Sequence, residues 1–505
     1  MLRKCLIANR GEIAVRILRA CRELGVRTVA VYSEVDANAR HVRLADEAVA
    51  VGGAAPSESY LNVDRLIAAA LATGCDCVHP GYGFLSEVET FAEAVIAAGL
   101  VWIGPPPDAI RRMGVKTEAR ALMERAGVPL APGFQSDAAD DAAFLTAAGQ
   151  IGYPVMVKAA GGGGKGIRVV YDPAALPESL AAARREALHA FGDPRVYLEK
   201  FIERARHIEI QVFGDSHGNI VHLFERECSA QRRHQKVIEE SPSPLLTPEL
   251  RANMGAAAVE AACAVGYVNA GTVEFIAAAS GEYYFLEMNT RLQVEHPVTE
   301  LVTGLDLVKL QFAVAAGEAL PFTQADLTQR GHAIEARLYA EDPRAGFLPA
   351  TGVLLRFLPP AGLGVRVDSG VESGDAITIH YDPMIAKIIV HDSTRAGAIR
   401  RLDAALRETT LIGTTTNLGF LRALVNHPAF AAGEIDTNFI ERHLDDLLPA
   451  DDLPLPDGAL IAVALADLNG GQSAESVQAA NTAPGDPWAL ADGFRLGQGA
   501  LRIDR

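Results

Sequence analysis

The sequence predicts a multidomain protein that combines the α/β and α+β fold classes. Its 505 residues are enough for about three domains at roughly 100–200 residues each. A hydrophobic fraction of 49% with 22% charged residues is ordinary for folded chains, which excludes global disorder and fibrous repeats. The N-terminal part alternates strand and helix patterns, which indicates a parallel sheet. No segment repeats with a period of about 20–50 residues, so a solenoid is disfavoured.

The N-terminal segment has the pattern of a β-α-β unit. Residues 5–8 form a buried strand pattern, residues 11–24 a helix with apolar side chains on one face, and residues 28–32 the next strand. Two parallel strands joined by a right-handed crossover are therefore expected. A dinucleotide-binding domain is the alternative, but the turn at residues 8–12 lacks the Gly-x-Gly-x-x-Gly that lets a backbone approach a pyrophosphate. Residues 79–87 form a turn-rich loop with an aromatic residue at its tip.

A lysine and a glycine run follow in the second region. Residues 151–158 are predicted to form a strand that ends in Lys158, just before the glycine-rich loop at 161–166. Adjacent glycines lose much backbone entropy when fixed, so this loop is expected to move or to approach another group closely. It is not a Walker A loop, and glycines alone would fit a flexible linker. The strand-end lysine favours phosphate binding by a closing lid.

Two β-rich runs, residues 272–276 and 283–289, are separated by a short stretch that contains Ser280-Gly281 and so predict a hairpin. If the turn is centred there, Glu274 lies opposite Glu287. Carboxylates at facing positions, with Cβ atoms about 4.5–5.5 Å apart, repel each other. A divalent cation would remove that penalty, and oxygen ligands together with substrate phosphates suit magnesium.

The second strand of the hairpin, continued at period two, places several polar side chains on one face. These side chains are Glu287, Asn289, Arg291, Gln293 and Glu295. A half-exposed strand with a solvated polar face is the ordinary explanation of such alternation. The opposed carboxylate and the mixture of acids, arginine and amides favour a catalytic surface.

A basic island at residues 226–236 stands out in an acidic chain. A solvated charged loop is the usual explanation of such a run, although it also offers anion ligands to a neighbouring nucleotide site. Beyond it, residues 331–444 are predicted to form an α+β domain, and a helix is expected over 438–444. Residues 448–456 form an acidic linker with prolines, followed by a short extra segment at 457–505.

The net charge is −17, from 46 Lys+Arg against 63 Asp+Glu, which argues against nucleic acid as a partner. The sequence contains no run of about 18 apolar residues, so no membrane span is predicted. No signal peptide is expected either. Six scattered cysteines form neither a disulfide framework nor a paired zinc pattern, which fits a reducing compartment. A cytoplasmic enzyme is therefore expected.

The chain resembles the biotin carboxylases, members of the ATP-grasp superfamily, over about residues 1–446. Six segments carry the resemblance: IANRGEIAVRI at 7–17, HPGYGFLSE at 79–87, the lysine and glycine loop at 158–166, RHIEIQV at 206–212, ECSAQRRHQKVIEE at 227–240, and LEMNTRLQVEHPVTE at 286–300. A chance match of this extent is not credible.

The resemblance implies a domain organisation. It comprises a pre-ATP-grasp domain at 1–115, an ATP-grasp domain at 116–330 with a mobile lid at about 131–203, a C-terminal biotin carboxylase domain at 331–446, and a linker with the start of an incomplete domain at 447–505. The implied reaction converts ATP and bicarbonate to ADP and carboxyphosphate, after which the ureido nitrogen of biotin is carboxylated. The implied cofactors are ATP, Mg²⁺ or Mn²⁺ (two ions expected), and biotin as carboxyl acceptor.

The resemblance also implies a nucleotide site. ATP phosphates would be held by Lys116 and Lys158, with Gly163 and Gly164 in the lid loop. The adenine would contact Glu199, Lys200 and Ile202, and the nucleotide site would be lined by His207, Gln231 and His234. Glu274 and Glu287 would face ATP through the metal, and the implied metal ligands are Glu274, Glu287 and Asn289.

The implied reaction site adjoins these ligands. Bicarbonate would be positioned by Arg291, Gln293 and Val294, with Glu295 as its general base. Lys236 would neutralise carboxyphosphate. Biotin would contact Tyr82 and Arg337, and Arg337 would stabilise its ureido anion. Arg291, Glu295, Lys236 and Arg337 are thus the expected catalytic residues.

No methionine is followed directly by lysine, the pattern of a biotin-accepting site, so biotin is expected on another chain or in a part beyond this one. Residues 434–441 and 486–496 resemble α subunits of acyl-CoA carboxylases, and the 3-methylcrotonyl-CoA type is favoured. An acetyl-CoA or propionyl-CoA carboxylase is the alternative. The expected partners are a biotinyl carrier domain, a carboxyltransferase β subunit and a second copy in a homodimer. The expected location is the cytoplasm, or the mitochondrial matrix in a eukaryote.

Two other classes of function compete with this one. A non-catalytic scaffold could keep the fold to bind a biotinyl partner, and a different ATP-grasp ligase would form an acyl phosphate without biotin. The complete set of implied catalytic residues argues against the first. The loop at 79–87 and Arg337 disfavour the second.

Overall fold

The structure is a computed structural model that describes residues 2–135, 140–159, 168–191, 193–233, 235–448 and 457–468. The chain divides into two compact units, Met1–Pro449 and Ala450–Arg505, and each is described by itself. The second unit contains the helix α17 (Asp457–Leu468). Among the described residues, no helix is both long enough and apolar enough to cross a membrane.

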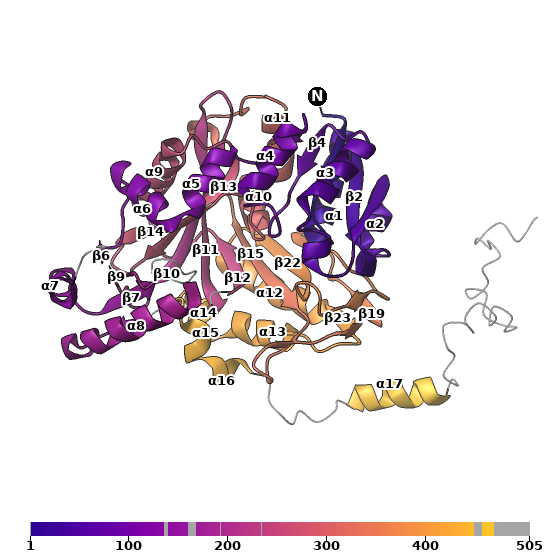
Figure 1. The fold of residues 1–505 in the computed structure, drawn as a ribbon. Helices are drawn as coiled ribbons and strands as arrows, with labels where there is room; N and C mark the ends of the chain where they lie inside the picture. The colour runs from indigo at the N-terminus through magenta and orange to yellow at the C-terminus, as the bar shows by residue number, and fades with distance from the viewer. Residues whose placement is uncertain are drawn as a thin grey trace, which may run out of the picture. The chain divides into compact units, whose positions relative to one another are not determined.

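The N-terminal part of the first unit is built on a parallel five-stranded sheet of order β3-β2-β1-β4-β5 (Figure 1). The strands are β1 (Lys4–Ile7), β2 (Arg27–Ser33), β3 (Glu47–Gly52), β4 (Cys77–His79) and β5 (Val101–Trp102). The helices are α1 (Gly11–Leu24), α2 (Arg40–Leu44), α3 (Val63–Ala72), α4 (Glu89–Ala97) and α5 (Pro107–Gly114). Because β1 pairs with β2 in parallel across α1, the predicted β-α-β unit is confirmed. All six cysteines are free thiols.

A larger, antiparallel sheet of eight strands carries the centre of the molecule, in the order β14-β13-β10-β11-β12-β15-β22-β20. Its strands are β10 (Arg206–Gly214), β11 (Ile220–Arg232), β12 (Gln235–Ser241), β13 (Asn269–Ala277), β14 (Tyr283–Asn289), β15 (His332–Tyr339), β20 (Val365–Ser369) and β22 (Met384–Asp392). The pairing of β12 with β15 joins strands from the predicted domains at 116–330 and 331–446 in one sheet. The basic island at 226–236 therefore lies mainly in β11 and β12, so the usual explanation of such a run, a solvated loop, does not hold here.

The two faces of this sheet differ in chemistry. One face is apolar and packs against α9 (Pro248–Ala264), α12 (Arg395–Glu408) and α13 (Leu418–Asn426). The opposite face carries charged side chains and is partly covered by α10 (His296–Thr303). The helix α11 (Leu307–Ala315) packs against α1, and the two helices share a separate hydrophobic cluster. Of the predicted site residues, Lys236, Glu274 and Arg337 lie on this charged face.

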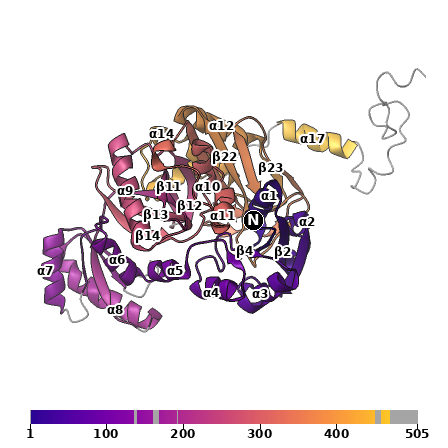
Figure 2. The same cartoon turned by 90° about the horizontal axis from the view of Figure 1, so that it is seen from above.

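A separate four-stranded sheet, of order β6-β9-β7-β8, corresponds to the predicted lid. Its strands are β6 (Gly133–Gln135), β7 (Val155–Ala159), β8 (Arg168–Val170) and β9 (Val196–Lys200), and its helices are α7 (Asp141–Ile151) and α8 (Leu176–Phe191). The helices α7 and α8 cover it and form its own hydrophobic cluster (Figure 2). The preceding helix α6 (Lys116–Arg125) packs in the same hydrophobic cluster as α9. The prediction of a strand from residue 151 was partly wrong, because α7 continues to Ile151 and ends at Gly152, whose φ of 80° breaks the helix. The glycine loop at 161–166 lies outside the described residues.

Residues 331–444 have an α+β structure, as predicted. Besides β15, β20 and β22 it contains the short strands β16 (Glu341–Asp342), β17 (Leu348–Pro349), β18 (Gly352–Val353), β19 (Arg356–Leu358), β21 (Ala376–Ile377) and β23 (Thr410–Ile412). The predicted helix at 438–444 is divided between two short helices. The last helices of the unit are α14 (Pro428–Ala431), α15 (Phe439–Arg442) and α16 (Leu444–Leu447). Short 3-10 helices occupy Glu34–Asp36, Pro56–Glu58, Pro173–Ala175 and Gln324–Asp326.

Candidate active site

The hairpin of β13 and β14 brings Glu274 opposite Glu287, as predicted. The register that does so is not the simple one. Near the turn Phe275 pairs with Phe285, and a β-bulge at Leu286 then shifts the pairing by one residue. Without that extra residue Glu274 would face Leu286, and Glu287 would point to the other side of the sheet. The bulge therefore creates the carboxylate pair.

The two carboxylates of this pair do not face uncompensated repulsion, which corrects the sequence-based argument. Glu274 is buried and accepts hydrogen bonds from Asn289 Nδ2 and Gln293 Nε2, both at 2.9 Å. Lys236 also donates to it, at 3.0 Å. Glu287 is half-exposed, and its carboxylate lies 3.6 Å from the ammonium of Lys116. A lysine thus neutralises each acid.

Lys236 is the charge centre of the site. Its Nζ donates to Glu209, to Glu274 and to Glu295, the last at 2.5 Å. Burial opposes its charged form, but the three carboxylates raise the pKa of Lys236 well above its usual value. A β-bulge in β12 sets the direction of this side chain. Ala230 pairs with Ile238 and Gln231 pairs with Lys236, so Val237 is an extra residue on β12. Lys236 therefore leaves the apolar face on which Ile238 packs.

Glu295 is held by cations from two strands. Its carboxylate contacts Lys236 through one oxygen and Arg337 Nη2 of β15 through the other, at 3.0 Å. The side chain is 2% exposed. Burial alone would raise the pKa of Glu295, but Lys236, Arg337 and Arg226 hold it well below its usual value. The carboxylate is therefore ionised at neutral pH and able to accept a proton.

The prediction that one polar row continues along β14 to residue 295 was wrong. β14 ends at Asn289, residues 290–293 are irregular, and Val294 and Glu295 form a turn just before α10, which has Pro297 in its first turn. Proline has no amide hydrogen to continue a ladder and favours a helix start. Gln293 nevertheless donates a hydrogen bond to Glu274, and Glu295 accepts one from Lys236, because the segment after β14 folds back over the sheet.

Arg291 lies in this irregular segment after β14. Its Nε donates to Glu87 at 2.8 Å and its Nη2 to Asn289 Oδ1 at 3.0 Å. Burial opposes the charge, but Glu87 raises the pKa of this guanidinium. Glu87 belongs to the loop at 79–87 and also accepts from the amide of Thr290. The N-terminal loop thus holds the predicted bicarbonate segment.

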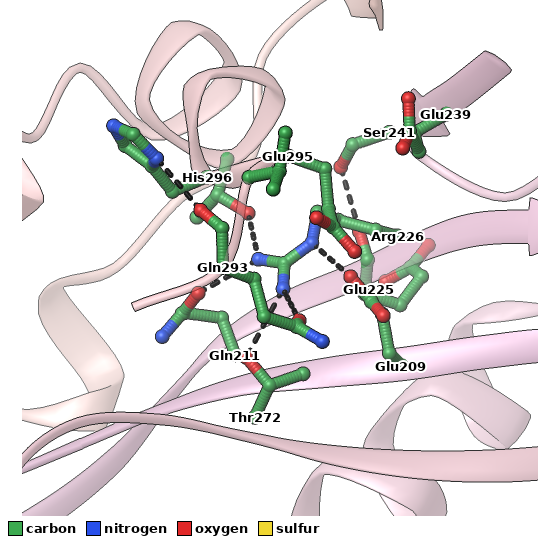
Figure 3. Close-up of polar contacts among 12 residues, drawn as sticks. Glu209, Gln211, Glu225, Arg226, Glu239, Ser241, Thr272, Gln293, Glu295 and His296 are labelled. Carbon is green, nitrogen blue, oxygen red and sulfur yellow. Dashed lines mark hydrogen bonds and ion pairs between the residues drawn. The ribbon is translucent and has the colours of Figure 1, made fainter. Parts of the chain in front are cut away.

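Arg226 of β11 is a wholly buried residue of the site that sequence reasoning missed (Figure 3). Its guanidinium donates to five side chains: Glu209, Gln211, Thr272, Gln293 and Thr299. The bond to Gln293 Oε1, at 2.6 Å, fixes an amide whose nitrogen donates to Glu274. One signal could have found its partners, since His207, Glu209 and Gln211 alternate with apolar residues along β10.

On the nucleotide side, Lys158 and Glu199 contact each other across β7 and β9, and Arg120 Nη1 donates to Glu199 at 2.9 Å. Lys200 instead donates to the carbonyl oxygens of Gly152 and Tyr153, at 2.8 and 3.0 Å. The structure therefore places the two predicted adenine residues in different contacts.

The remaining predicted residues divide into three groups. Gln231 is buried opposite Lys236, and Ile202 is half-buried beyond β9. The hydroxyl of Tyr82 is buried and has no hydrogen-bond partner among the described residues. Gly163, Gly164 and His234 lie outside the described residues.

The oxygen donors of Glu274, Glu287 and Asn289 fit a hard divalent cation, because they lie at facing or successive same-face positions of β13 and β14. A second possible set, His207, Glu209 and Glu274, is buried. It fits a cation less well, since Lys236 already contacts both of its carboxylates. His207 Nε2 lies 3.1 Å from Glu274. Although burial opposes protonation, that carboxylate raises the pKa of His207.

Three protein-family models match the chain: biotin carboxylase N-terminal domain over residues 1–110, carbamoyl-phosphate synthase L chain ATP-binding domain over 115–323, and biotin carboxylase C-terminal domain over 335–442. The methylcrotonoyl-CoA carboxylase α subunit of Oryza sativa subsp. japonica is 53% identical over 448 residues, which are 88% of this chain and 61% of that protein. The chain thus spans about three fifths of such relatives. Biotin carboxylase 1 of Bacillus subtilis is 52% identical over 445 residues, 88% of this chain and 99% of that protein.

Solved structures agree with this match. The biotin carboxylase domain dimer of Hydrogenobacter thermophilus 2-oxoglutarate carboxylase, in complex with MgADP, ADP and bicarbonate, is 46% identical with a TM-score of 0.83, over 89% of this chain and 100% of that one. A Campylobacter jejuni biotin carboxylase nucleotide complex is 44% identical with a TM-score of 0.82, over 88% of this chain and 99% of that one. This chain belongs to the biotin carboxylase family.

Proposed function

We propose that the chain catalyses the ATP-dependent carboxylation of biotin by bicarbonate, through carboxyphosphate. The observation that carries the proposal is the position of Lys236 between Glu274, on the metal side, and Glu295, beside Arg337. This arrangement puts a fixed cation between a nucleotide site and a base. The names of the relatives, and the ADP and bicarbonate bound to one neighbour, support the same reaction.

In the first step, an oxygen of bicarbonate attacks the γ-phosphorus of ATP while the bond from that phosphorus to the β–γ bridging oxygen breaks, so that ADP leaves. Glu295 accepts the bicarbonate proton, since its carboxylate is ionised. Arg291, Gln293 and the backbone of Val294 orient bicarbonate, and Lys236 offsets the charge of carboxyphosphate. Mg²⁺ or Mn²⁺ held by Glu274, Glu287 and Asn289 would neutralise phosphate charge.

In the second step, the bond between the carboxyl carbon of carboxyphosphate and its phosphate oxygen breaks, the ureido nitrogen of biotin bonds to that carbon, and the released phosphate accepts the proton of that nitrogen. Arg337 is buried, and the anionic ureido oxygen would take the place of carboxylate partners that it now contacts, Glu239 at 2.6 Å and Glu295 at 3.0 Å. Tyr82 offers a buried hydroxyl without a partner among the described residues. Lys116, Lys158, Gly163, Gly164, Glu199, Lys200, Ile202, His207, Gln231 and His234 are the proposed ATP contacts. The proposed domain boundaries remain those of the sequence analysis.

The acyl-CoA that finally receives the carboxyl group would be chosen by a partner carboxyltransferase. We propose a 3-methylcrotonyl-CoA type system, because α subunits of that type are among the relatives. An acetyl-CoA or propionyl-CoA carboxylase is the alternative. A biotinyl carrier domain, a carboxyltransferase β subunit and a second copy of the chain are the proposed partners. The proposed location is the cytoplasm, or the mitochondrial matrix, since the names of these relatives include the word mitochondrial.

The test is ADP release by the purified chain with ATP, Mg²⁺, bicarbonate and free biotin. Release should depend on both bicarbonate and biotin and should stop when either is omitted. ADP release that is the same with and without bicarbonate and biotin would overturn the proposal. Parallel assays with several acyl-CoA substrates, in the presence of the co-expressed carrier and carboxyltransferase, would identify the final acceptor.

A further inference from the structure

Lys387 of β22 is a buried cation that the sequence analysis did not connect with the site. Its side chain is 0% exposed, and its Nζ donates to the carbonyl oxygen of Val294 at 2.6 Å. That carbonyl belongs to the peptide bond that joins Val294 to Glu295. We infer that Lys387 is a positioning residue that fixes the backbone of Glu295 and so the bicarbonate segment. The inference rests on the function proposed above.

Lys387 and Arg337 hold the same residue from neighbouring strands. Lys387 of β22 lies directly opposite Arg337 of β15, so both side chains leave the same face of the sheet. Arg337 binds the carboxylate of Glu295 at 3.0 Å, while Lys387 binds the peptide bond before it. The two cations, at facing positions of neighbouring strands, therefore fix both the carboxylate of Glu295 and the peptide bond before it.

The ammonium of Lys387 also joins three regions of the chain. It lies 3.3 Å from Glu12 in the first turn of α1 and 4.0 Å from Asp368, its facing residue on β20. Arg366 donates to Asp368 at 2.6 Å. Burial disfavours the charged lysine, but nearby carboxylates, Glu12 first among them, raise the pKa of Lys387. The lysine therefore stays charged in a dry site.

A charged donor suits this task. A hydrogen bond from an ammonium to a carbonyl is shorter and roughly twice as strong as a neutral one. Because the Lys387 side chain is fully buried, bulk solvent competes little with this bond. The strand pairing of β14 ends at Asn289, so residues 290–294 lie outside the sheet. The geometry of this segment therefore depends on such side-chain contacts. Loss of the donor should let this segment move.

The central test is Lys387→Met, which keeps most of the side-chain volume and removes the donor. The KM for bicarbonate should rise about tenfold to 100-fold, as expected for a misplaced binding segment, whereas the KM for ATP should stay within about twofold. Lys387→Met also leaves Glu12 without its cation. The double variant Glu12→Gln/Lys387→Met removes that imbalance and should retain the high KM for bicarbonate.

Glu12→Gln alone is the matched control. It keeps the bond from Lys387 to Val294, so the KM for bicarbonate should stay near that of the wild type. A double variant that folds, by circular dichroism and thermal unfolding, and keeps the wild-type KM for bicarbonate would overturn the inference. A rise of the same size in Glu12→Gln would also overturn it, since the donor would not be the cause.

Hydrogen exchange gives a readout that does not need turnover. Amides of residues 291–296 should exchange faster in Glu12→Gln/Lys387→Met than in Glu12→Gln, because the segment opens more often. If the wild type shows no bicarbonate- and biotin-dependent ADP release, the proposed function fails. The exchange rates then still decide whether Lys387 holds this segment, and equal rates in the two variants would overturn that role.

Discussion

The ammonium nitrogen of Lys236 lies 2.5 Å from a carboxylate oxygen of Glu295. The lysine reaches this position because the bulge in β12 turns it to the charged face of the sheet. A buried acid beside such a cation stays ionised, and a buried cation beside an acid can later face a substrate anion. The same contact thus keeps Glu295 ionised for its proposed role as base and keeps Lys236 charged for its proposed role beside carboxyphosphate.

Replacing Lys236 tests this relationship. In Lys236→Met the pKa of Glu295 should rise, because burial then acts with one fewer opposing cation. The acidic limb of the kcat/KM profile for bicarbonate should move to higher pH, and kcat should fall by about 10²–10³-fold, as for loss of a preorganised charge donor. Lys309→Met, on α11 with an ion pair to Glu23, is the control. An unchanged pH profile would contradict the assignment.

Glu295→Gln removes the base and keeps the shape of the side chain. Bicarbonate-dependent turnover should fall by about 10²–10⁴-fold, since the amide accepts no proton, while ATP binding measured by calorimetry should remain. Glu318→Gln, at an exposed position after α11, is the matched control. Turnover close to that of the wild type would remove Glu295 from the role of base.

Glu287→Gln tests the metal site. Because Glu287 is half-exposed, the variant strands no buried charge and should fold normally. The Mg²⁺ concentration for half-maximal ADP release should rise by roughly tenfold or more, since even indirect partners of a metal commonly cost 10–100-fold in affinity. Glu282→Gln, exposed in the same hairpin, should leave this concentration unchanged. Equal Mg²⁺ dependence in both variants would argue against Glu287 as a ligand.

Arg226→Met tests the buried polar cluster. The variant should be destabilised by about 3–5 kcal/mol, because it leaves Glu209 buried with one cation fewer and several acceptors unpaired. The midpoint of thermal unfolding should fall accordingly. Arg226→Met/Glu209→Gln should recover part of that loss, because it removes the stranded charge. A midpoint equal to that of the wild type in the single variant would show that Arg226 is dispensable for stability.

His79 makes the stability depend on pH. Its Nδ1 accepts from the amide of Gly81 at 3.0 Å, so its Nε2 carries the proton and donates to Gln311. Burial lowers the pKa of His79 to about 3. The unfolded chain binds a proton below about pH 6.5 and the folded chain does not, so stability falls as the pH is lowered from about 6.5 towards 3.

The check is the thermal unfolding midpoint between pH 7.5 and 5. The midpoint of His79→Gln should fall less over this interval than that of the wild type, because one such proton is removed; His41, whose pKa burial lowers to about 4, contributes in both. His217→Gln, at an exposed position, should keep the wild-type dependence. The same dependence in His79→Gln as in the wild type would contradict the prediction.

Local patterns predicted several elements well. The helix at 11–24 agrees with α1, because its apolar residues recur at helical spacing and Gly25 ends it. The facing positions of Glu274 and Glu287 were also correct. The turn is centred on Ser280 and not between Ser280 and Gly281, which shifts each facing position by one residue, and the bulge at Leu286 compensates for that shift. A bulge depends on the packing of both strands, so alternation along one strand does not reveal it.

The sequence by itself determined the family, the hairpin that carries two acids and the side chains that the chemistry needs. Those properties follow from residue identity and short-range spacing, which the chain carries without folding. Only the tertiary structure decided that β14 ends at Asn289, that Lys236 turns to the charged face, and that Arg226 and Lys387 support the site from beneath. A buried cation is stable only beside acids brought from distant strands, so its role exists only once those strands have paired.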